Sequence, residues 1–306
     1  MRVLFFVLLF SVALQGLQGN TCLAQVAPCA TPAAFTLADA LSRPGCIQEL
    51  NLRRQELEQL PASIGQLPRL RTLYLNENHL RQLPEAVTQL DSLRVLFVNK
   101  NSLLTLPPAI GNLHRLQQLQ IDQNLLSELP PSIGGLDSLR FLLSAYNNFT
   151  SLPEQLGNLT QLDYFDSSHN QLLFLPESVS ELRRLRYMYL NDNKLQRLPA
   201  QLGNLTRLEE LNLSNNQLEK LPASLGNCQN LKVLILSGNQ LKTLPKSLGK
   251  LSKLEMLIVN DNQLTALPRS LSKLKQLKTI IVKQNAFTPA ARRQAEAALP
   301  DAKIYF

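Results

Sequence analysis

Leucine recurs through most of the chain in a fixed pattern that one short dipeptide marks. Ten of its occurrences lie 23 residues apart, with no insertion or deletion between them. These Leu-Pro dipeptides are at 60–61, 83–84, 106–107, 129–130, 152–153, 175–176, 198–199, 221–222, 244–245 and 267–268. Aligned on this dipeptide, each unit reads LxxLxLxxNxLxxLPxxIGxL, as in residues 70–90. A constant period of this length indicates a solenoid of stacked structural units, since one unit cannot bury its apolar face alone.

The columns of the alignment predict the local structure. LxL places two leucines on one face of a short strand and the residue between them on the other, and stacking such strands produces a parallel sheet. We expect a ladder of asparagine amides at the turn after each strand, where they can donate to and accept from buried backbone. It comprises Asn78, Asn101, Asn124, Asn147, Asn170, Asn193, Asn216, Asn239, Asn262 and Asn285. The first unit has Gln55 in this column.

The return segments carry two further signals. The proline suits the first position of a short helix, where its missing N–H does no harm. A glycine follows in most units and is expected to stop the helical turn so that the chain can reverse. It occurs as Gly65, Gly111, Gly134, Gly157, Gly203, Gly226 and Gly249. Cys228 occupies a column otherwise filled by leucine, so we expect a buried and unreactive thiol.

These motifs resemble the leucine-rich-repeat family, in its 23-residue class with Leu-Pro and Ile-Gly, as in Ras-group repeat proteins. The resemblance covers residues 47–288, about 11 units. It implies an α/β fold, a right-handed horseshoe-shaped solenoid with a parallel sheet on the concave face and short helical or 3-10 segments on the convex face. It says almost nothing about the ligand.

Both ends of the chain depart from the repeat. Residues 1–24 combine a positive start, the apolar run 3–14 and then small residues, which is typical of a secretory signal peptide. Cleavage after Ala24 is preferred to cleavage after Gly19, and a membrane anchor or buried helix is the alternative. Residues 25–46 and 289–306 are expected to cap the open ends of the solenoid, the second with a helix.

The predicted export changes how the cysteines are interpreted. Disulfides are permissible in exported proteins, and Cys29 and Cys46 flank the N-terminal cap, so a disulfide between them is the leading interpretation. Lipidation of Cys22 is an alternative that lacks the usual apolar residue three positions earlier. No later stretch approaches transmembrane length, so the mature chain is expected to be secreted or at the cell surface, or in the periplasm if its source is bacterial.

The strand positions that do not pack inward are free to bind a ligand. Aromatic residues gather there, and Phe141, Tyr146, Tyr164, Tyr187 and Tyr189 should form one patch over three adjacent strands, as binding hot spots do. The bland alternative is that aromatics simply suit strands. A second, apolar patch follows toward the C-terminus. The candidate ligand-binding residues of the concave face are Tyr74, Phe97, Phe141, Tyr146, Tyr164, Asp166, His169, Tyr187, Tyr189, Ile235 and Ile258.

The remaining chemistry argues against catalysis. The three histidines form no cluster, no serine, cysteine or carboxylate pair completes a nucleophile–base arrangement, and we expect neither a metal site nor a cofactor. The net charge is +8, with lysines such as Lys246, Lys250 and Lys273 placed on the convex and return segments. Nucleic acid is not expected as a partner, because the basic residues do not interleave with the aromatic ones. The sequence therefore predicts an exported, non-catalytic protein that binds a protein or peptide through its concave face, or alternatively a glycan-binding or adhesion protein.

Overall fold

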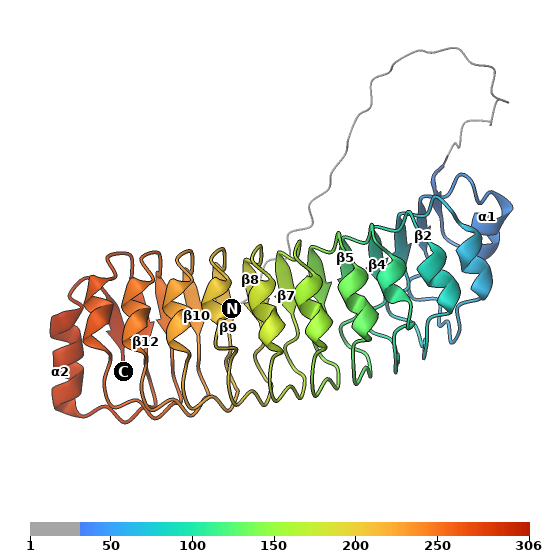
Figure 1. Ribbon diagram of the computed structural model, residues 1–306. Helices are drawn as coiled ribbons and strands as arrows, with labels where there is room; N and C mark the ends of the chain where they lie inside the picture. Colours follow the sequence, from blue (N-terminus) through green and yellow to red (C-terminus); the bar gives the residue numbers. More distant parts are fainter. Residues whose placement is uncertain (1–30) are drawn as a thin grey trace, which may run out of the picture. The chain divides into compact units, whose positions relative to one another are not determined.

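A computed structural model describes residues 31–306 as one row of parallel strands with short helices on the other side of the coil (Figure 1). The predicted signal peptide, Cys22 and Cys29 lie outside the described residues, so both the cleavage site and the Cys29–Cys46 disulfide stay predictions. The 13 strands follow one another in the sheet in chain order. They are β1 (Ala33–Ala34), β2 (Glu49–Asn51), β3 (Thr72–Tyr74), β4 (Val95–Phe97), β5 (Gln118–Gln120), β6 (Phe141–Leu143), β7 (Tyr164–Asp166), β8 (Tyr187–Tyr189), β9 (Glu210–Asn212), β10 (Val233–Ile235), β11 (Met256–Ile258), β12 (Thr279–Ile281) and β13 (Lys303–Tyr305).

The return segments contain ten short 3-10 helices, flanked by one α-helix near each end of the described chain. In order, they are α1 (Leu37–Ser42), η1 (Ala62–Gln66), η2 (Glu85–Gln89), η3 (Ile110–Asn112), η4 (Pro131–Gly135), η5 (Glu154–Asn158), η6 (Glu177–Glu181), η7 (Leu202–Asn204), η8 (Ala223–Asn227), η9 (Lys246–Lys250), η10 (Arg269–Lys273) and α2 (Pro289–Ala298). The expected sheet of parallel strands with short 3-10 segments is confirmed.

Each strand from β2 to β12 buries its middle side chain and leaves the two flanking side chains partly exposed. The strands pair without slippage, so that Leu50 lies opposite Leu73 and Leu96 opposite Leu119. This in-phase register follows from the constant period, because a slip of one residue would turn every buried leucine toward solvent. The core is therefore a continuous stack of leucines, with Phe149 and Phe165 also fully buried.

Proline sits one position earlier than expected. It is the N-cap of eight of the ten 3-10 helices, with φ and ψ of −64° and 145° at Pro61, instead of the first helical residue. Its carbonyl accepts the first bond of the turn, as in the 3.1 Å contact from the Ile64 amide to Pro61. The ring thus holds the extended conformation that an N-cap needs, and the missing amide would have had no partner in the turn.

The repeated glycines do not terminate the helices, which corrects the expectation. They lie within the 3-10 turns, and none of them has a positive φ. A side chain would collide with the next turn, since a Cβ on Gly111 would lie 2.0 Å from the Ser132 carbonyl oxygen. Thr88, Ser180 and Ser272 replace the glycine in three units, and the 3-10 helices that follow the first two, η3 and η7, are the two shortened ones. Glycine therefore allows adjacent turns to pack closely.

The asparagine ladder connects each unit to the one before it. The Asn124 amide donates to Val98 O of the preceding unit and to Ile121 O of its own, each at 3.0 Å, and its oxygen accepts from the Leu103 amide at 2.9 Å. Eight of the ten ladder asparagines are buried. In the first unit, Gln55 extends to the N-terminal segment and donates to Phe35 O at 2.7 Å.

Both ends of the described chain continue the sheet. Strand β1 pairs with β2, and β13 pairs with β12, which extends the sheet by one strand beyond the repeats at each end. Thr36 and Thr288 cap the two α-helices through their hydroxyl groups. At the C-terminal end the rings of Phe287 and Phe306 pack edge to face, with centroids 5.3 Å apart. The C-terminal segment, α2 and β13, covers the apolar end of the last unit.

The burial predicted for Cys228 is confirmed. Its side chain is fully buried, and its thiol lies 3.6 Å from the Leu202 carbonyl oxygen. Burial raises the pKa of this thiol to about 12, because the thiolate would be stripped of water. Among the described residues, Cys228 is a free cysteine that behaves as part of the core.

Candidate binding face

The candidate site lies on the face of the sheet that turns away from the leucine core. We call this surface the open face, defined as the first and third side chains of strands β2 to β12. All of them are partly exposed, whereas the residue between them is buried in every strand. Because neighbouring strands lie about 4.8 Å apart, side chains in one column contact each other across the sheet.

Four aromatic residues form a connected group in the middle of the open face. Tyr164 on β7 contacts Phe141 on β6, with ring centroids 6.4 Å apart. It also contacts both tyrosines of β8, Tyr187 at 6.1 Å and Tyr189 at 5.4 Å. We call these four residues the central aromatic cluster. Each ring is held by its neighbours in a tilted arrangement, so binding a partner would cost little side-chain entropy.

Carboxylates border this cluster, and burial raises their pKa values. Burial raises the pKa of Asp166 on β7, although two bonds from Ser168 to its Oδ1 oppose the effect, at 2.9 Å from the amide and 2.7 Å from the hydroxyl. Burial likewise raises the pKa of Glu210 on β9. Burial and these nearby negative charges raise the pKa values of Tyr164 and Tyr189, so both phenols remain neutral donors.

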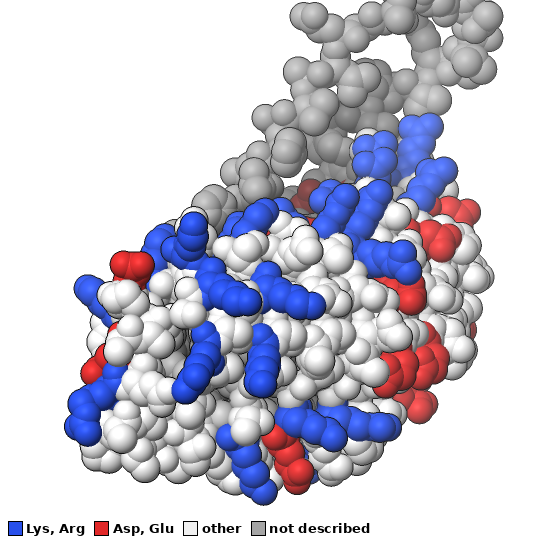
Figure 2. Space-filling view, turned by 60° about the vertical axis from the view of Figure 1, so that its left-hand side comes forward, with Lys and Arg blue, Asp and Glu red and all other residues white. Residues whose placement is uncertain are grey.

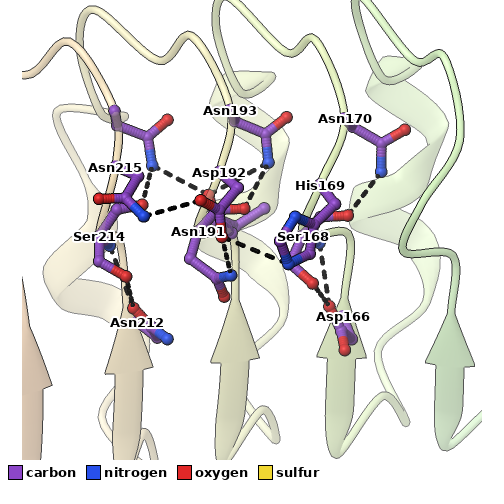
Figure 3. Close-up of polar contacts among 12 residues, drawn as sticks. Asp166, Ser168, His169, Asn170, Asn191, Asp192, Asn193, Asn212, Ser214 and Asn215 are labelled. Atoms are coloured by element: carbon purple, nitrogen blue, oxygen red, sulfur yellow. Dashed lines mark hydrogen bonds and ion pairs between the residues drawn. The ribbon is translucent and has the colours of Figure 1, made fainter. Parts of the chain in front are cut away.

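Tyr146 and His169 lie beside the strands instead of on them. Both occupy the turn that follows a strand, with positive φ values of 54° and 51°. Their rings stack with centroids 4.0 Å apart, and His169 Nε2 lies 3.3 Å from Asp192 Oδ2 in the next turn. Asp192 Oδ1 in turn accepts from the Asn215 amide at 2.7 Å (Figure 3). The expected single patch is therefore two neighbouring groups, the central aromatic cluster and this row of turn residues.

The other predicted residues form two separate groups on the open face. Tyr74 and Phe97 on β3 and β4 contact each other with centroids 5.2 Å apart, and strand β5, with glutamine on its open face, separates them from the cluster. Ile235 and Ile258 lie opposite each other on β10 and β11, beyond the polar open-face residues of β9. The structure thus distributes the candidate residues over four groups and not one.

Sequence reasoning missed a column of alternating charge at the entrance to the strands. Arg186 pairs with Asp163 at 2.9 Å and approaches Glu209 at 3.7 Å, and Lys232 contacts Glu209 at 2.7 Å. The signal was present in the residue just before each of strands β6 to β12, where consecutive units place charges of opposite sign. Such cross-strand pairs satisfy each other, so most of this column is structural.

Exposed apolar side chains on the turns were also missed. Leu104, Leu125, Leu173 and Phe174 are exposed by 39% or more, and Arg197 lies 5.0 Å above the Phe174 ring. These residues occupy turn columns that are polar in most units, so the repeat consensus hides them.

The lysines expected on the return segments lie there. Lys246 and Lys250 belong to η9, and Lys273 belongs to η10, as expected. Figure 2 shows Lys and Arg spread over the face that includes the C-terminal units, with few acidic side chains between them. The central aromatic cluster is therefore separate from the lysine-rich surface.

Within residues 31–306, no group of three or more His, Cys, Asp or Glu side chains has an arrangement that could hold a metal ion. In the same part of the chain, no helix is long and apolar enough to cross a membrane.

Comparison with family models and known proteins agrees with the fold. A model described as leucine-rich repeat region matches residues 47–123. A second, described as leucine rich repeat, matches four overlapping segments, 162–218, 183–241, 206–264 and 229–287. A comparison with curated proteins found no match.

Solved structures share the architecture at low identity. The functional domain of InlJ from Listeria monocytogenes superposes with a TM-score of 0.70 at 22% identity, over 85% of this chain and 53% of that one. A chain of the octameric complex of Latrophilin 3, Unc5D and FLRT2 (LRR) gives 0.70 at 22% identity, over 85% and 83%. A chain of the PEPR1–AtPEP1 crystal structure gives 0.63 at 27% identity, over 85% and 45%. This chain thus spans about half of the InlJ and PEPR1 chains. With its ten regular Leu-Pro units, single parallel sheet and matches to both family models, the chain belongs to the leucine-rich-repeat family.

Proposed function

We propose that this protein is an exported, non-catalytic binding protein whose protein or peptide partner docks on the central aromatic cluster. The observation that carries the proposal is the contact network of Phe141, Tyr164, Tyr187 and Tyr189 on three adjacent strands. These large side chains face away from a core that leucine already fills, so packing of the core does not require them. Rigid, partly exposed aromatic groups with polar neighbours are typical of binding hot spots.

The composition of the cluster favours a polypeptide partner. Neutral phenols offer hydrogen-bond donors to a peptide backbone, the neighbouring carboxylates offer acceptors, and the ring faces offer apolar contact. PEPR1, which shares 27% identity with this chain, was solved together with AtPEP1. That precedent supports a protein or peptide ligand more than a glycan.

Capture experiments test the site. The mature protein is immobilised and exposed to proteins from the surroundings of its source, next to a Tyr187→Ser/Tyr189→Ser double variant and a Tyr305→Ser control at the exposed end of the sheet. The proposal expects a partner retained by wild type and by the control but lost from the double variant, with unchanged melting temperatures. A partner held equally by all three proteins would place the site elsewhere. Retention of a glycan, with no protein bound, would replace the proposal.

Export has its own measurement. The full chain is expressed in a secretion-competent host, and the protein that the cells export is sequenced from its N-terminus. We expect the sequence to begin at Gln25, after cleavage at Ala24, whereas a start at Asn20 would indicate the earlier cleavage site. Retention of the whole chain in the cytoplasm would contradict export.

A further inference from the structure

A cavity of about 760 Å³ lies at the edge of the sheet where the chain enters strands β6 to β9. Its walls come from four consecutive units and carry Arg140, Arg184, Arg186 and Arg207, together with the shorter Asp137 and Asp163. We call this site the arginine cavity. Its volume falls within the range of ordinary small-ligand pockets, about 300–1,000 Å³.

The arginine cavity carries four guanidinium groups but only two carboxylates, so it retains an excess of positive charge. Asp163 is engaged by Arg186 at 2.9 Å, and the Asp137 carboxylate lies 3.1 Å from His114 Nδ1. Arg184 donates to the neutral side chain of Gln161. Within residues 31–306, Arg140, Arg184 and Arg207 form no ion pair with a carboxylate. This excess of guanidinium groups over carboxylates favours an anionic ligand.

The arginine cavity adjoins the central aromatic cluster. The Arg140 guanidinium lies 5.8 Å from the centroid of the Phe141 ring, and that of Arg186 lies 5.1 Å from the Tyr187 ring. Both contacts are cation–π interactions between residues that are adjacent in sequence. A ligand that rests on the aromatic rings would therefore bring its next groups within reach of the arginines.

The charge pattern distinguishes between kinds of anion. Along the column before the strands, Arg140, Asp163, Arg186 and Glu209 alternate in sign from unit to unit. A continuous polyanion lying across these strands would meet a carboxylate at every second unit, which is unfavourable. Single carboxylates on spaced side chains avoid that repulsion and match the planar geometry of guanidinium groups.

We propose that the arginine cavity binds carboxylate side chains of an acidic peptide segment, whose neighbouring apolar side chains lie on the central aromatic cluster. This inference rests on the proposed function and names the chemistry of the partner. The sequence that would fit alternates acidic and aromatic or apolar residues, because arginines of the cavity lie directly beside the rings of Phe141 and Tyr187.

Calorimetric titration with defined probes tests the inference. The probes are the acetylated, amidated tetrapeptides EFEF and QFQF and a heparin-derived oligosaccharide, all at low ionic strength. The protein is compared with an Arg184→Gln/Arg207→Gln variant, which removes two arginines that form no ion pair. Arg115→Gln is the matched control, because Arg115 occupies the same column three units earlier and lies outside the cavity.

We expect wild type and the control to bind EFEF, and the double variant to bind it on the order of tenfold more weakly. QFQF should bind the wild type at least as weakly as EFEF binds the double variant. Equal affinity of wild type and double variant for EFEF, no binding of EFEF to wild type, or binding of the heparin oligosaccharide in its place would overturn the inference.

The two proposals fail in different ways. If the Tyr187→Ser/Tyr189→Ser variant loses its captured partner while the arginine variant binds EFEF as wild type does, only the arginine cavity is misassigned. If the tyrosine variant keeps its partner while EFEF binding depends on the arginines, the cavity is an anion site and the proposed docking surface is wrong.

Discussion

A Cβ atom on Gly203 would lie 2.0 Å from the carbonyl oxygen of Ser224, which belongs to the next turn of the solenoid. The obstacle is backbone, not the flexible end of a side chain, so it cannot move aside without shifting that turn. The same relationship recurs at Gly226 and Ser247, at 2.2 Å. Glycine therefore sets how closely consecutive 3-10 turns approach on the side opposite the strands.

Gly203→Ala is accordingly expected to lower the free energy of unfolding by about 1–3 kcal/mol, the usual cost of forcing an extra carbon into a packed site. Urea unfolding followed by circular dichroism measures the change. Gly45→Ala is the control, because a Cβ there has no neighbour within 4 Å and should change stability by less than about 0.5 kcal/mol. Equal effects of the two substitutions would show that close packing is not the reason for the glycine.

The fold could be predicted from the sequence alone because every unit buries its leucines in the same way. The period of 23 residues fixes which leucines are buried, and the buried middle residue of every strand agrees with the LxL pattern. Column membership also identified Cys228 as part of the core, although its chemistry alone would have suggested a reactive group.

Side-chain contacts between residues of different units were harder to predict from the sequence. Tyr146 and His169 share a column with Glu77, and all three have a positive φ, a conformation that tyrosine and glutamate rarely adopt. The two rings stack because they occupy the same column in consecutive units, and neither residue alone indicates this contact. The arginine cavity likewise joins residues about 23 positions apart, so it becomes visible only when equivalent positions are compared across units.

Asn147 offers a test of the asparagine ladder. Its amide donates to Ile121 O at 3.0 Å and Ser144 O at 3.2 Å, and its oxygen accepts from the Leu126 amide at 3.0 Å. Asn147→Ala leaves these buried groups without partners, at about 1–3 kcal/mol for each group, and should lower the urea midpoint strongly. Asn148→Ala is the control, because that adjacent side chain is exposed and forms no hydrogen bond. Similar midpoints for both variants would contradict the role of the ladder.

Asp122 predicts a dependence of stability on pH. Burial, with the nearby charge of Asp166, raises the pKa of Asp122 from 3.8 to about 6. Between about pH 4 and pH 6 the folded state therefore binds more protons than the unfolded state, so this group lowers the free energy of unfolding as pH rises through that window. Asp122→Asn removes the cost of the buried charge and should stabilise the protein by about 1–3 kcal/mol at pH 7.

The difference between Asp122→Asn and wild type should shrink toward zero near about pH 3, where the carboxyl group is largely protonated in both states. Urea unfolding at the two pH values measures it. Asp91→Asn, at an exposed position, should show the same small difference at both. A stabilisation of Asp122→Asn that grows on acidification would have the wrong sign and would reject the assignment.

The buried thiol of Cys228 can be used to test whether a small reagent reaches the core of the native protein. With full burial and a pKa raised to about 12, the thiol should resist iodoacetamide in the native protein at mildly alkaline pH. In denaturant the same residue should be labelled completely, and peptide mapping against a Cys228→Ala variant identifies the modified site. Native labelling at the rate of an unfolded thiol would mean that the leucine stack opens readily around η8. Protection that disappears only at the urea concentration of global unfolding would instead show that this part of the core opens only when the solenoid unfolds.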